Sequence, residues 1–255
     1  MIPRLYCTAP LAPDQPVQLG PEEFHYLRNV LRRDVGAEVI LFNERDGEFN
    51  GTITSLGKKA GVVTLTTQSR APSSGASHHV TLAFAPVKRQ PVEVIIQKGT
   101  ELGVAVFAPV LTARTNLDRL RLDRLNAIAK EAGEQSGRLA IPSVETPLPL
   151  AQFLSENDGV TTIFCDETGD NPKAEWGGPQ GRAMPLLEAV ADIEETSVII
   201  LIGPEGGFTP EERDLLRARA RTIAVTLGPR ILRADTAAIT ALALWQAAKG
   251  DLRRS

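Results

Sequence analysis

The chain has few cysteines and few histidines. Its 255 residues include two cysteines, Cys7 and Cys165, which lie far apart without CxxC spacing. That count argues against a disulfide framework and against a zinc knuckle. The three histidines are His25 and the adjacent pair His78-His79, which lies in a Ser/Gly-rich stretch. Adjacent histidines in such a stretch are usually solvated, so we expect no metal site.

Long apolar runs are missing as well. The start, MIPRLYCTAP, contains no apolar segment of signal-peptide length. The longest weakly polar stretch, residues 236–248, is too short and too interrupted by threonine to span a bilayer. We therefore predict a cytoplasmic protein that does not enter the membrane. The net charge of −3 excludes indiscriminate coating of nucleic acid but leaves room for a local basic face.

Residues 1–70 predict a small domain of short strands. β-like runs cover residues 4–8, 38–42, 48–54 and 61–67, and turns at Asp46-Gly47 and Gly57-Lys58 separate the last three. A proline-containing loop follows the first strand, and a helix is predicted over residues 21–31. Short strands joined by tight turns favour a small antiparallel barrel.

Basic residues recur on the predicted helix. His25, Arg28 and Arg32 stand at i, i+3 and i+7, which would place them on one helical face. Such a face is either an RNA contact or an ordinary solvated surface, and for this helix taken alone the solvated surface is favoured.

Residues 71–78 are small and polar without periodicity, and we predict a linker there. The remaining residues, 79–255, alternate between strand and helix. Strands are expected at 80–85, 106–111, 160–165, 198–202 and 223–227, and helices at 92–102, 117–135, 186–191, 210–219 and 236–248. This alternation predicts an α/β domain with a parallel sheet covered on both faces. Residues 168–181 are expected to form a surface loop.

Two glycine-containing turns follow strands of this predicted sheet. One run stops at Gly203-Pro204-Glu205-Gly206-Gly207, and a helix opens after it with Thr209 as N-cap, Pro210 at the first position and Glu212 three residues past the cap. The other run ends at Gly228-Pro229. In an open parallel sheet ligands bind outside the carboxyl ends of the strands, where both turns lie.

The first turn matches neither GxxxxGK[ST] nor GxGxxG. Its backbone N–H groups near a helix N-terminus suit an anion or the polar edge of a purine, but a tight turn without a ligand is an equal alternative. After the second turn come Arg230, Arg233 and Asp235, and Asp235-Thr236 can cap the last helix. That helix is apolar almost all round, which suggests packing against a second subunit and hence a homodimer.

Further basic and polar residues lie along the second domain. Lys88-Arg89 follow the first strand of this domain, where ligand-contacting loops are found, although a salt-bridged surface is a strong alternative for the others. Together with the face on the first domain they fit an RNA backbone better than a small neutral metabolite. The candidates for RNA binding are His25, Arg28, Arg32, Lys88, Arg89, Arg114, Arg124, Gln135 and Arg138.

Four motifs of the sequence resemble those of a known family. LIGPEGGFTPEE followed by LGPRILRADTA is similar to the paired C-terminal signature of the ribosomal small subunit methyltransferase E family, which belongs to the SPOUT superfamily. HYLRNVLR resembles the N-terminal motif of the family, and KRQPVEVIIQKGTELGV and EAGEQSGR resemble its central motifs. The family pattern often reads LRTETA, where this chain has Leu232-Arg233-Ala234-Asp235-Thr236-Ala237.

The resemblance implies a fold and an activity. The fold would be a PUA-like N-terminal β-barrel followed by a SPOUT domain, whose parallel sheet carries a C-terminal trefoil knot, a rare exception to unknotted topology. The activity would be methylation of N3 of a uridine in 16S rRNA of the small ribosomal subunit, with S-adenosylmethionine as the cofactor held in the knot of a homodimer. Rival readings are a SPOUT ribose 2′-O-methyltransferase and a non-catalytic RNA-binding factor in ribosome assembly.

The resemblance and the chemistry together suggest roles. Uridine N3 carries a proton at neutral pH, so transfer needs that proton removed or the resulting anion stabilised. Arg230 or Arg233 would stabilise negative charge on the uracil oxygens, and Asp235 would orient that arginine or accept the proton. The residues expected at the cofactor are Leu201, Ile202, Gly203, Pro204, Glu205, Gly206, Gly207, Leu227, Gly228, Ile231 and Leu232.

Overall fold

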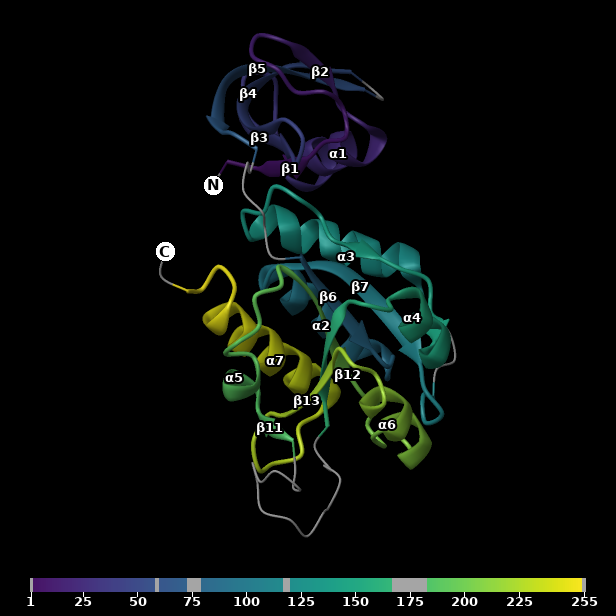
Figure 1. The fold of residues 1–255 in the computed structure, drawn as a ribbon. Helices are drawn as coiled ribbons and strands as arrows, with labels where there is room; N and C mark the ends of the chain where they lie inside the picture. Colours follow the sequence, from purple (N-terminus) through teal and green to yellow (C-terminus); the bar gives the residue numbers. More distant parts are fainter. Residues whose placement is uncertain (1, 58–59, 73–78, 117–119, 167–182, 254–255) are drawn as a thin grey trace. The chain divides into compact units, whose positions relative to one another are not determined.

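The computed structural model describes residues 2–57, 60–72, 79–116, 120–166 and 183–253 (Figure 1). The chain forms two compact units, the first made of Met1–Gly75 with Gly133–Ile141 and the second of Ala76–Ala132 with Pro142–Ser255. The chain therefore returns to its first unit for a short segment that carries most of the EAGEQSGR motif. Most of the predicted linker, residues 73–78, and the loop predicted at 168–181 lie outside the described residues.

The first unit contains a five-stranded sheet in the order β1-β3-β4-β5-β2. Its strands are β1 (Arg4–Tyr6), β2 (Pro16–Gln18), β3 (Glu38–Asn43), β4 (Gly47–Leu56) and β5 (Gly61–Arg70). β1 pairs with β3 in parallel, and the other pairs are antiparallel. The proline-containing loop predicted after the first strand includes a short strand, β2, that the sequence did not predict. Pro16 lacks an N–H donor, but it opens an edge strand, where that donor is not needed.

The helix predicted over residues 21–31 is present, but it changes from α-helix to π-helix along its length. Its first half is α1 (Pro21–His25), with Pro21 at the first turn, and its second half is the π-helix η1 (Tyr26–Val30). The Leu31 N–H donates to the Tyr26 carbonyl at 2.9 Å, which widens the turn to five residues. Arg32 lies beyond the helix with φ of 51°. The i, i+3, i+7 argument for one helical face is therefore wrong.

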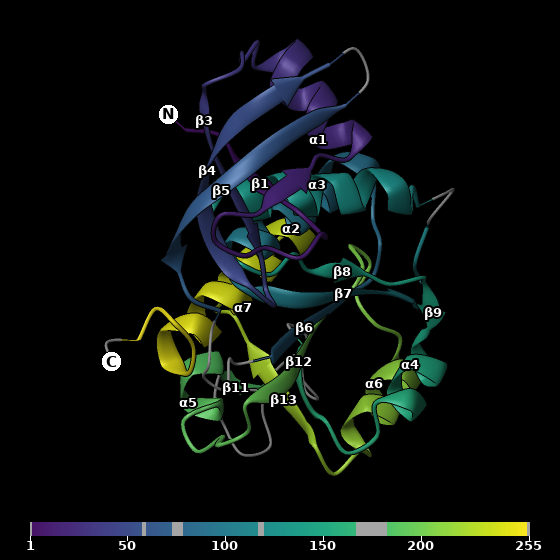
Figure 2. The same cartoon turned by 90° about the horizontal axis from the view of Figure 1, so that it is seen from above.

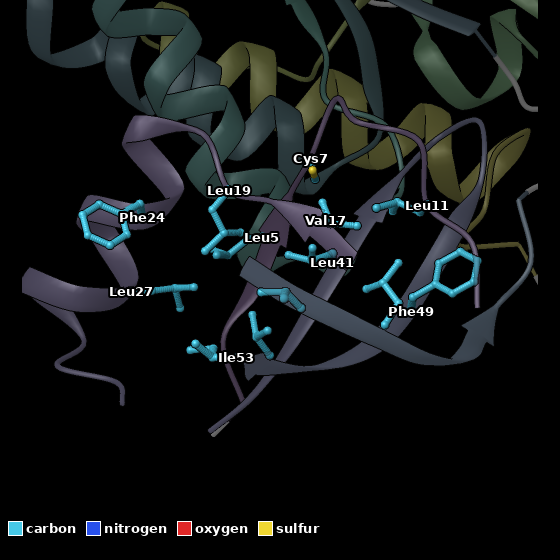
Figure 3. Close-up of a cluster of buried hydrophobic side chains, with 13 residues drawn as sticks. Leu5, Cys7, Leu11, Val17, Leu19, Phe24, Leu27, Leu41, Phe49 and Ile53 are labelled. Carbon is cyan, nitrogen blue, oxygen red and sulfur yellow. The ribbon is translucent and has the colours of Figure 1, made fainter. Parts of the chain in front are cut away.

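The core of the first unit joins the helix to the sheet. Leu5 of β1, Leu41 of β3 and Ile53 of β4 are buried together with Phe24 and Leu27. Figure 3 shows these side chains gathered between the helical segment and the strands of the sheet. The strand faces alternate between buried and exposed positions along β4, as expected for a sheet with one packed face.

The second unit contains a parallel sheet in the order β11-β13-β10-β12-β6-β7-β8, with β9 paired to β7. The strands are β6 (His79–Phe84), β7 (Val104–Leu111), β8 (Ser143–Val144), β9 (Leu148–Pro149), β10 (Thr161–Cys165), β11 (Met184–Pro185), β12 (Ser197–Ile202) and β13 (Thr222–Thr226). Every pair in it is parallel, which confirms the predicted α/β class. The short strands β8, β9 and β11 carry no periodic signal and were missed by the sequence prediction.

Helices cover both faces of this sheet (Figures 1 and 2). They are α2 (Arg89–Glu101), α3 (Leu122–Gln135), α4 (Leu150–Glu156), α5 (Leu186–Ala189), α6 (Pro210–Arg217) and α7 (Ala234–Ala248). On one face α4 and α6 pack on Ile199 and Leu201 of β12. On the other face α7 packs against α2, α5 and β12. α4 was not predicted, and α3 begins at Leu122 rather than at residue 117. Along the part of the chain described, helices long and apolar enough to cross a membrane are absent.

Candidate cofactor and RNA site

The loop at Gly203 leaves β12 at the carboxyl edge of the sheet. Gly207 adopts φ of 68°, and its N–H donates to the Pro204 carbonyl at 2.8 Å, so the loop turns back sharply. At Gly203 an added Cβ would lie 2.6 Å from the ring of Phe208. Glycine at this position lets that ring close over the strand end, where it meets Phe164 edge-on with ring centroids 5.0 Å apart.

The helix after this loop begins with the predicted cap. The Thr209 hydroxyl accepts from the Glu212 N–H at 3.3 Å, and the Glu212 carboxylate accepts from the Thr209 N–H at 2.9 Å. Pro210 occupies the first turn, so the capping box predicted from the sequence is confirmed. The cap fixes the point at which the glycine loop must end and α6 must begin.

A hollow of about 640 Å³, counted out to its open mouth, lies where β10, β12 and β13 end. Since these strands are neighbours and parallel, the loops that follow them meet at one edge. The lining combines apolar side chains with backbone of the glycine loops and with a few charged groups. It consists of Cys165, Asp166, Ile202, Gly203, Pro204, Glu205, Gly207, Phe208, Val225, Leu227, Gly228, Arg230, Leu232, Ala234 and Ala237.

Asp166 is the buried charge of this hollow, with only 3% of the residue exposed. Its Oδ2 accepts from Arg213 Nε at 3.1 Å and from Arg217 Nη2 at 2.9 Å. A buried carboxylate is tolerated only when it is paired, and two arginines of α6 supply that pairing. The ion pairs tie the end of β10 to α6 and so brace the loop that precedes α6.

Most residues predicted to contact the cofactor line this hollow, but three do not. Leu201 is buried inside β12, facing the core that includes α4 and α6. Gly206 is absent from the lining, and its carbonyl accepts from Arg114. Ile231 is 86% exposed and does not line the hollow. The remaining predicted residues are Ile202, Gly203, Pro204, Glu205, Gly207, Leu227, Gly228 and Leu232, all of which line it.

The three candidate catalytic residues take different positions. Arg230 lines the hollow, whereas Arg233 is the N-cap residue of α7 and Asp235 lies in its first turn. The prediction that Asp235-Thr236 caps this helix is wrong, because the helix already begins at Ala234 and the Asp235 carboxylate accepts from the N–H of Thr236 within the helix, at 2.8 Å. An acid in the first turn still favours the helix dipole.

The loop after β7 contacts the glycine loop after β12. The Arg114 guanidinium donates to the Gly206 carbonyl at 2.5 Å. One residue earlier, the Ala113 N–H donates to the Glu212 carboxylate at 2.7 Å. Glu212 thus serves both the capping box and the β7 loop. We call this pair of contacts, from Arg114 and Ala113, the loop clamp. It was not foreseen from the sequence, which offered Arg114 only as an RNA contact.

A second hollow, of about 980 Å³, lies where β6 and β7 end. Predicted RNA candidates Lys88, Arg89 and Arg124 line it, together with Glu93 and Asn116. Glu93 Oε1 lies 2.9 Å from Arg89 Nε and 3.6 Å from Arg124 Nε. The hydrogen bond from Arg89, followed by the bond from Arg124, holds the pKa of the Glu93 carboxyl below its usual range.

In the first unit, two of the RNA candidates make local hydrogen bonds. Arg28 donates to the carbonyls of Leu56 and Gly57, so it braces the turn between β4 and β5. His25 Nδ1 lies 2.8 Å from the Asn29 amide. Arg32 sits apart, after the π-helix.

The other two candidates of this unit, Gln135 and Arg138, belong to the returning segment. Gln135 is exposed, and the Arg138 carbonyl accepts from Arg4 at 2.6 Å. Arg4 also donates to the carbonyls of Gly133 and Glu134, both at 3.2 Å, and its guanidinium pairs with Glu48 at 2.6 Å. Arg4 therefore fixes the end of α3 to the sheet of the first unit.

Sequence reasoning missed several residues that line the first hollow, chiefly Asp166 and Phe208. Asp166 directly follows β10, so the strand-end rule that located the glycine loops would have found it as well. Phe208 carries no such signal, because its place over the strand end depends on the absent side chain of Gly203.

Comparison with known proteins defines the class first. Residues 74–246 match the family model of an RNA methyltransferase domain, and residues 19–66 match that of an RNA methyltransferase PUA domain. The chain therefore combines an RNA methyltransferase domain with an RNA methyltransferase PUA domain.

The relatives narrow the class to one family. A protein of Rickettsia conorii named ribosomal RNA small subunit methyltransferase E is 32% identical, over 94% of this chain and 93% of its own length. A methyltransferase structure from Legionella pneumophila with bound S-adenosylmethionine is 30% identical and covers 98% of this chain and 99% of its own, with a TM-score of 0.79. A methyltransferase E structure from Neisseria gonorrhoeae, bound to S-adenosyl methionine, is 27% identical over 97% and 98% of the two chains, with a TM-score of 0.77. This chain belongs to the ribosomal RNA small subunit methyltransferase E family.

Proposed function

We propose that this chain methylates N3 of a uridine in 16S rRNA of the small ribosomal subunit, with S-adenosylmethionine as the methyl donor. The observation that carries the proposal is the first hollow, built from loops after three adjacent parallel strands in a chain of this family. The reaction takes place in the cytoplasm, where ribosomes are assembled.

The residues of the first hollow fit the proposed cofactor. Ile202, Leu227 and Leu232 offer apolar walls for an adenine ring, and the glycine loops offer backbone groups for its polar edge. Glu205 places a carboxylate in the lining, which suits the positive charges of the sulfonium and amino groups. S-adenosylmethionine supplies an electrophilic methyl group when it is bound.

We assign Arg230 to the uracil. Uridine N3 is a nucleophile only once its proton is lost, and the negative charge then spreads onto the uracil oxygens. The Arg230 guanidinium lines the hollow and stabilises this charge. Arg233 and Asp235 follow Arg230 in the sequence and lie at the start of α7. There Arg233 adds positive charge, and Asp235 orients an arginine or accepts the proton.

RNA binding is assigned to both units. His25, Arg28, Arg32, Gln135 and Arg138 of the first unit would hold the RNA backbone there, and the first unit is the PUA-like domain. In the second unit Lys88, Arg89, Arg114 and Arg124 take the same role. N3 lies on the Watson–Crick edge, so the target uridine must leave its stack to reach the first hollow.

We also propose a homodimer and a trefoil knot. Ile231 is 86% exposed beside the hollow, and α7 leaves Ile239, Ala243 and Leu244 only half-buried. An apolar surface of this kind is typical of a subunit interface. The knot would involve the loops that follow β12 and β13, in keeping with the family.

The proposal is tested by methylation of small-subunit RNA with purified protein, followed by digestion to nucleosides. N3-methyluridine is the expected product, and a 2′-O-methyl nucleoside would overturn the assignment. Arg230→Ala should lower kcat by about 100-fold while calorimetric binding of S-adenosylmethionine stays near wild type, as for loss of one charge-stabilising group. Unchanged turnover in Arg230→Ala would remove Arg230 from the mechanism. No binding of S-adenosylmethionine by the wild type would favour a non-catalytic RNA-binding protein.

A further inference from the structure

The second hollow has an apolar floor beneath a charged rim. Val87, Val92 and Leu125 line it and are buried, with exposed fractions of 8%, 2% and 3%. Leu120 is half-buried and Asn116 exposed at its side. An apolar floor with one neighbouring amide offers a nucleobase both apolar side chains to pack on and a hydrogen-bonding group for its edge.

The rim is strongly basic. Among the described residues of the lining, Lys88, Arg89, Arg121 and Arg124 stand against one acid, Glu93, and Arg121 also pairs with Asp123 at 3.3 Å. The side chains of Arg89 and Arg124 remain 73% and 49% exposed although both approach Glu93. Glu93 therefore orients two guanidinium groups without hiding them, which leaves their outer N–H groups available to a phosphate.

The start of α2 adds a further site for negative charge. Lys88 is the N-cap residue and has no side-chain hydrogen bond to the helix, and no acid stands in the first turn. Among the first residues of the helix, Pro91 carries no N–H, so Arg89 and Gln90 present theirs at the positive end of the helix dipole.

The position of this hollow relates it to the first one. β6 and β12 pair side by side, with Phe84 opposite Ile202, so the loops after the two strands leave the sheet next to each other. Asn116 of the second hollow lies two residues from Arg114, which holds Gly206 in the loop clamp. A ligand in the second hollow is thus close to the cofactor loop within the same unit.

From these observations we infer that the second hollow is a subsite for one nucleotide of the RNA that neighbours the target uridine. Its base packs on Val87, Val92 and Leu125 and against the half-buried Leu120, and its phosphate lies between Arg89 and Arg124. The inference rests on the proposed function, because it takes RNA to be the substrate. It goes further by assigning a base, and not only the backbone, to this part of the chain.

The test uses the full chain and an unmodified transcript of small-subunit RNA that contains the target uridine. RNA binding is measured directly at several salt concentrations. Arg124→Ala should weaken binding about tenfold and reduce the slope of log K against log salt by about 0.7, the value for one lost single-strand phosphate contact. Leu120→Ala should weaken binding about fivefold and leave the slope unchanged. Arg221→Ala is the matched control: Arg221 is also ion-paired to a glutamate, at 3.0 Å, but precedes β13 at the opposite edge of the sheet.

The base is located by replacing nucleotides near the target one at a time with abasic residues. An abasic residue at one position should lower the RNA affinity of the wild type about fivefold. The same abasic residue should lower the RNA affinity of Leu120→Ala less than twofold, because the substitution and the abasic residue remove the same contact between the base and the hollow. Equal losses in both proteins would overturn the base assignment. The subsite would be overturned if Arg124→Ala and Leu120→Ala both bind RNA as the wild type does. It would also be overturned if these variants change the oligomeric state of the protein and leave RNA affinity unchanged. If the wild type binds RNA but methylates none, the proposed function fails while these binding measurements still decide the subsite.

Discussion

The loop clamp predicts that Arg114 affects binding of the cofactor even when no RNA is present. Its guanidinium lies 2.5 Å from the Gly206 carbonyl, at the centre of the loop between β12 and α6. Hydrogen bonds to charged groups contribute about 1.5–3 kcal/mol when shielded from water. Arg114 is exposed, so water competes, and the contribution falls toward the roughly 1 kcal/mol of exposed charged contacts. A loss of about 1 kcal/mol corresponds to about a fivefold change in affinity.

We therefore expect Arg114→Ala to raise the Kd for S-adenosylmethionine about fivefold, measured by isothermal titration calorimetry on RNA-free protein. Arg114→Lys should give a smaller increase, because a lysine keeps the charge but not the planar guanidinium. Arg221→Ala serves again as the control, and its Kd should equal that of the wild type. The melting temperature of each variant without cofactor shows whether the fold itself has changed.

The result that would refute this reasoning is specific. If Arg114→Ala binds S-adenosylmethionine within twofold of the wild type and loses only RNA affinity, Arg114 is an RNA contact and the hydrogen bond to Gly206 contributes nothing. A fall in both affinities would instead agree with a residue that serves the RNA and the cofactor loop together.

Three further changes test other parts of the structure. Gly203→Ala should weaken cofactor binding about tenfold in a thermal-shift titration, because the new Cβ would lie 2.6 Å from the ring of Phe208 and overpacking of this kind costs about 1–3 kcal/mol. Hydrogen bonds, first of all from Arg45, hold the pKa of Asp46 below its unfolded value of 3.8. The Asp46 carboxylate therefore stabilises the fold above about pH 4, and this stabilisation is lost as the pH falls through the folded pKa. Asp46→Asn should flatten the fall of the melting temperature between about pH 4 and pH 2. Arg4→Met should lower the free energy of unfolding of the first unit in urea by about 3 kcal/mol, since the side chain is 13% exposed and holds the returning segment; a loss below about 1 kcal/mol would contradict that role.

The parts of the fold that the sequence predicts are those with local causes. The capping box at Thr209 and Glu212 needs only four consecutive residues, and the buried β-branched run of β12 needs only its own composition. The parts that it does not predict depend on distant partners. β2 pairs with β5, and the segment after Ala132 joins the first unit through hydrogen bonds with Arg4, Tyr6 and Arg70, which lie far away in the sequence.

The same distinction holds for the site. Glycines after strands mark the loops of the first hollow, since they are read from spacing alone. Asp166 is a single acid in the sequence, and its arginine partners stand 47 and 51 positions away, so its burial and pairing appear only in the folded chain. Arg114 was predicted only as an RNA contact, because its hydrogen bond to Gly206 spans 92 positions and carries no sequence signal.

The order of the strands places the loops of the two hollows along the same edge of the sheet. β13, β10 and β12 end at the first hollow, β6 and β7 end at the second, and the five strands are consecutive in the sheet. The loop clamp crosses from the β7 loop to the β12 loop, so RNA that orders the first also orders the second. Binding of the two ligands should then be linked, and linkage is reciprocal: the factor by which RNA tightens cofactor binding must equal the factor by which the cofactor tightens RNA binding. We expect a coupling of about fivefold in the wild type, measured with the two ligands added in either order, and about onefold in Arg114→Ala, where the connection is cut. Equal coupling in both proteins would mean that the linkage runs through another part of the sheet edge.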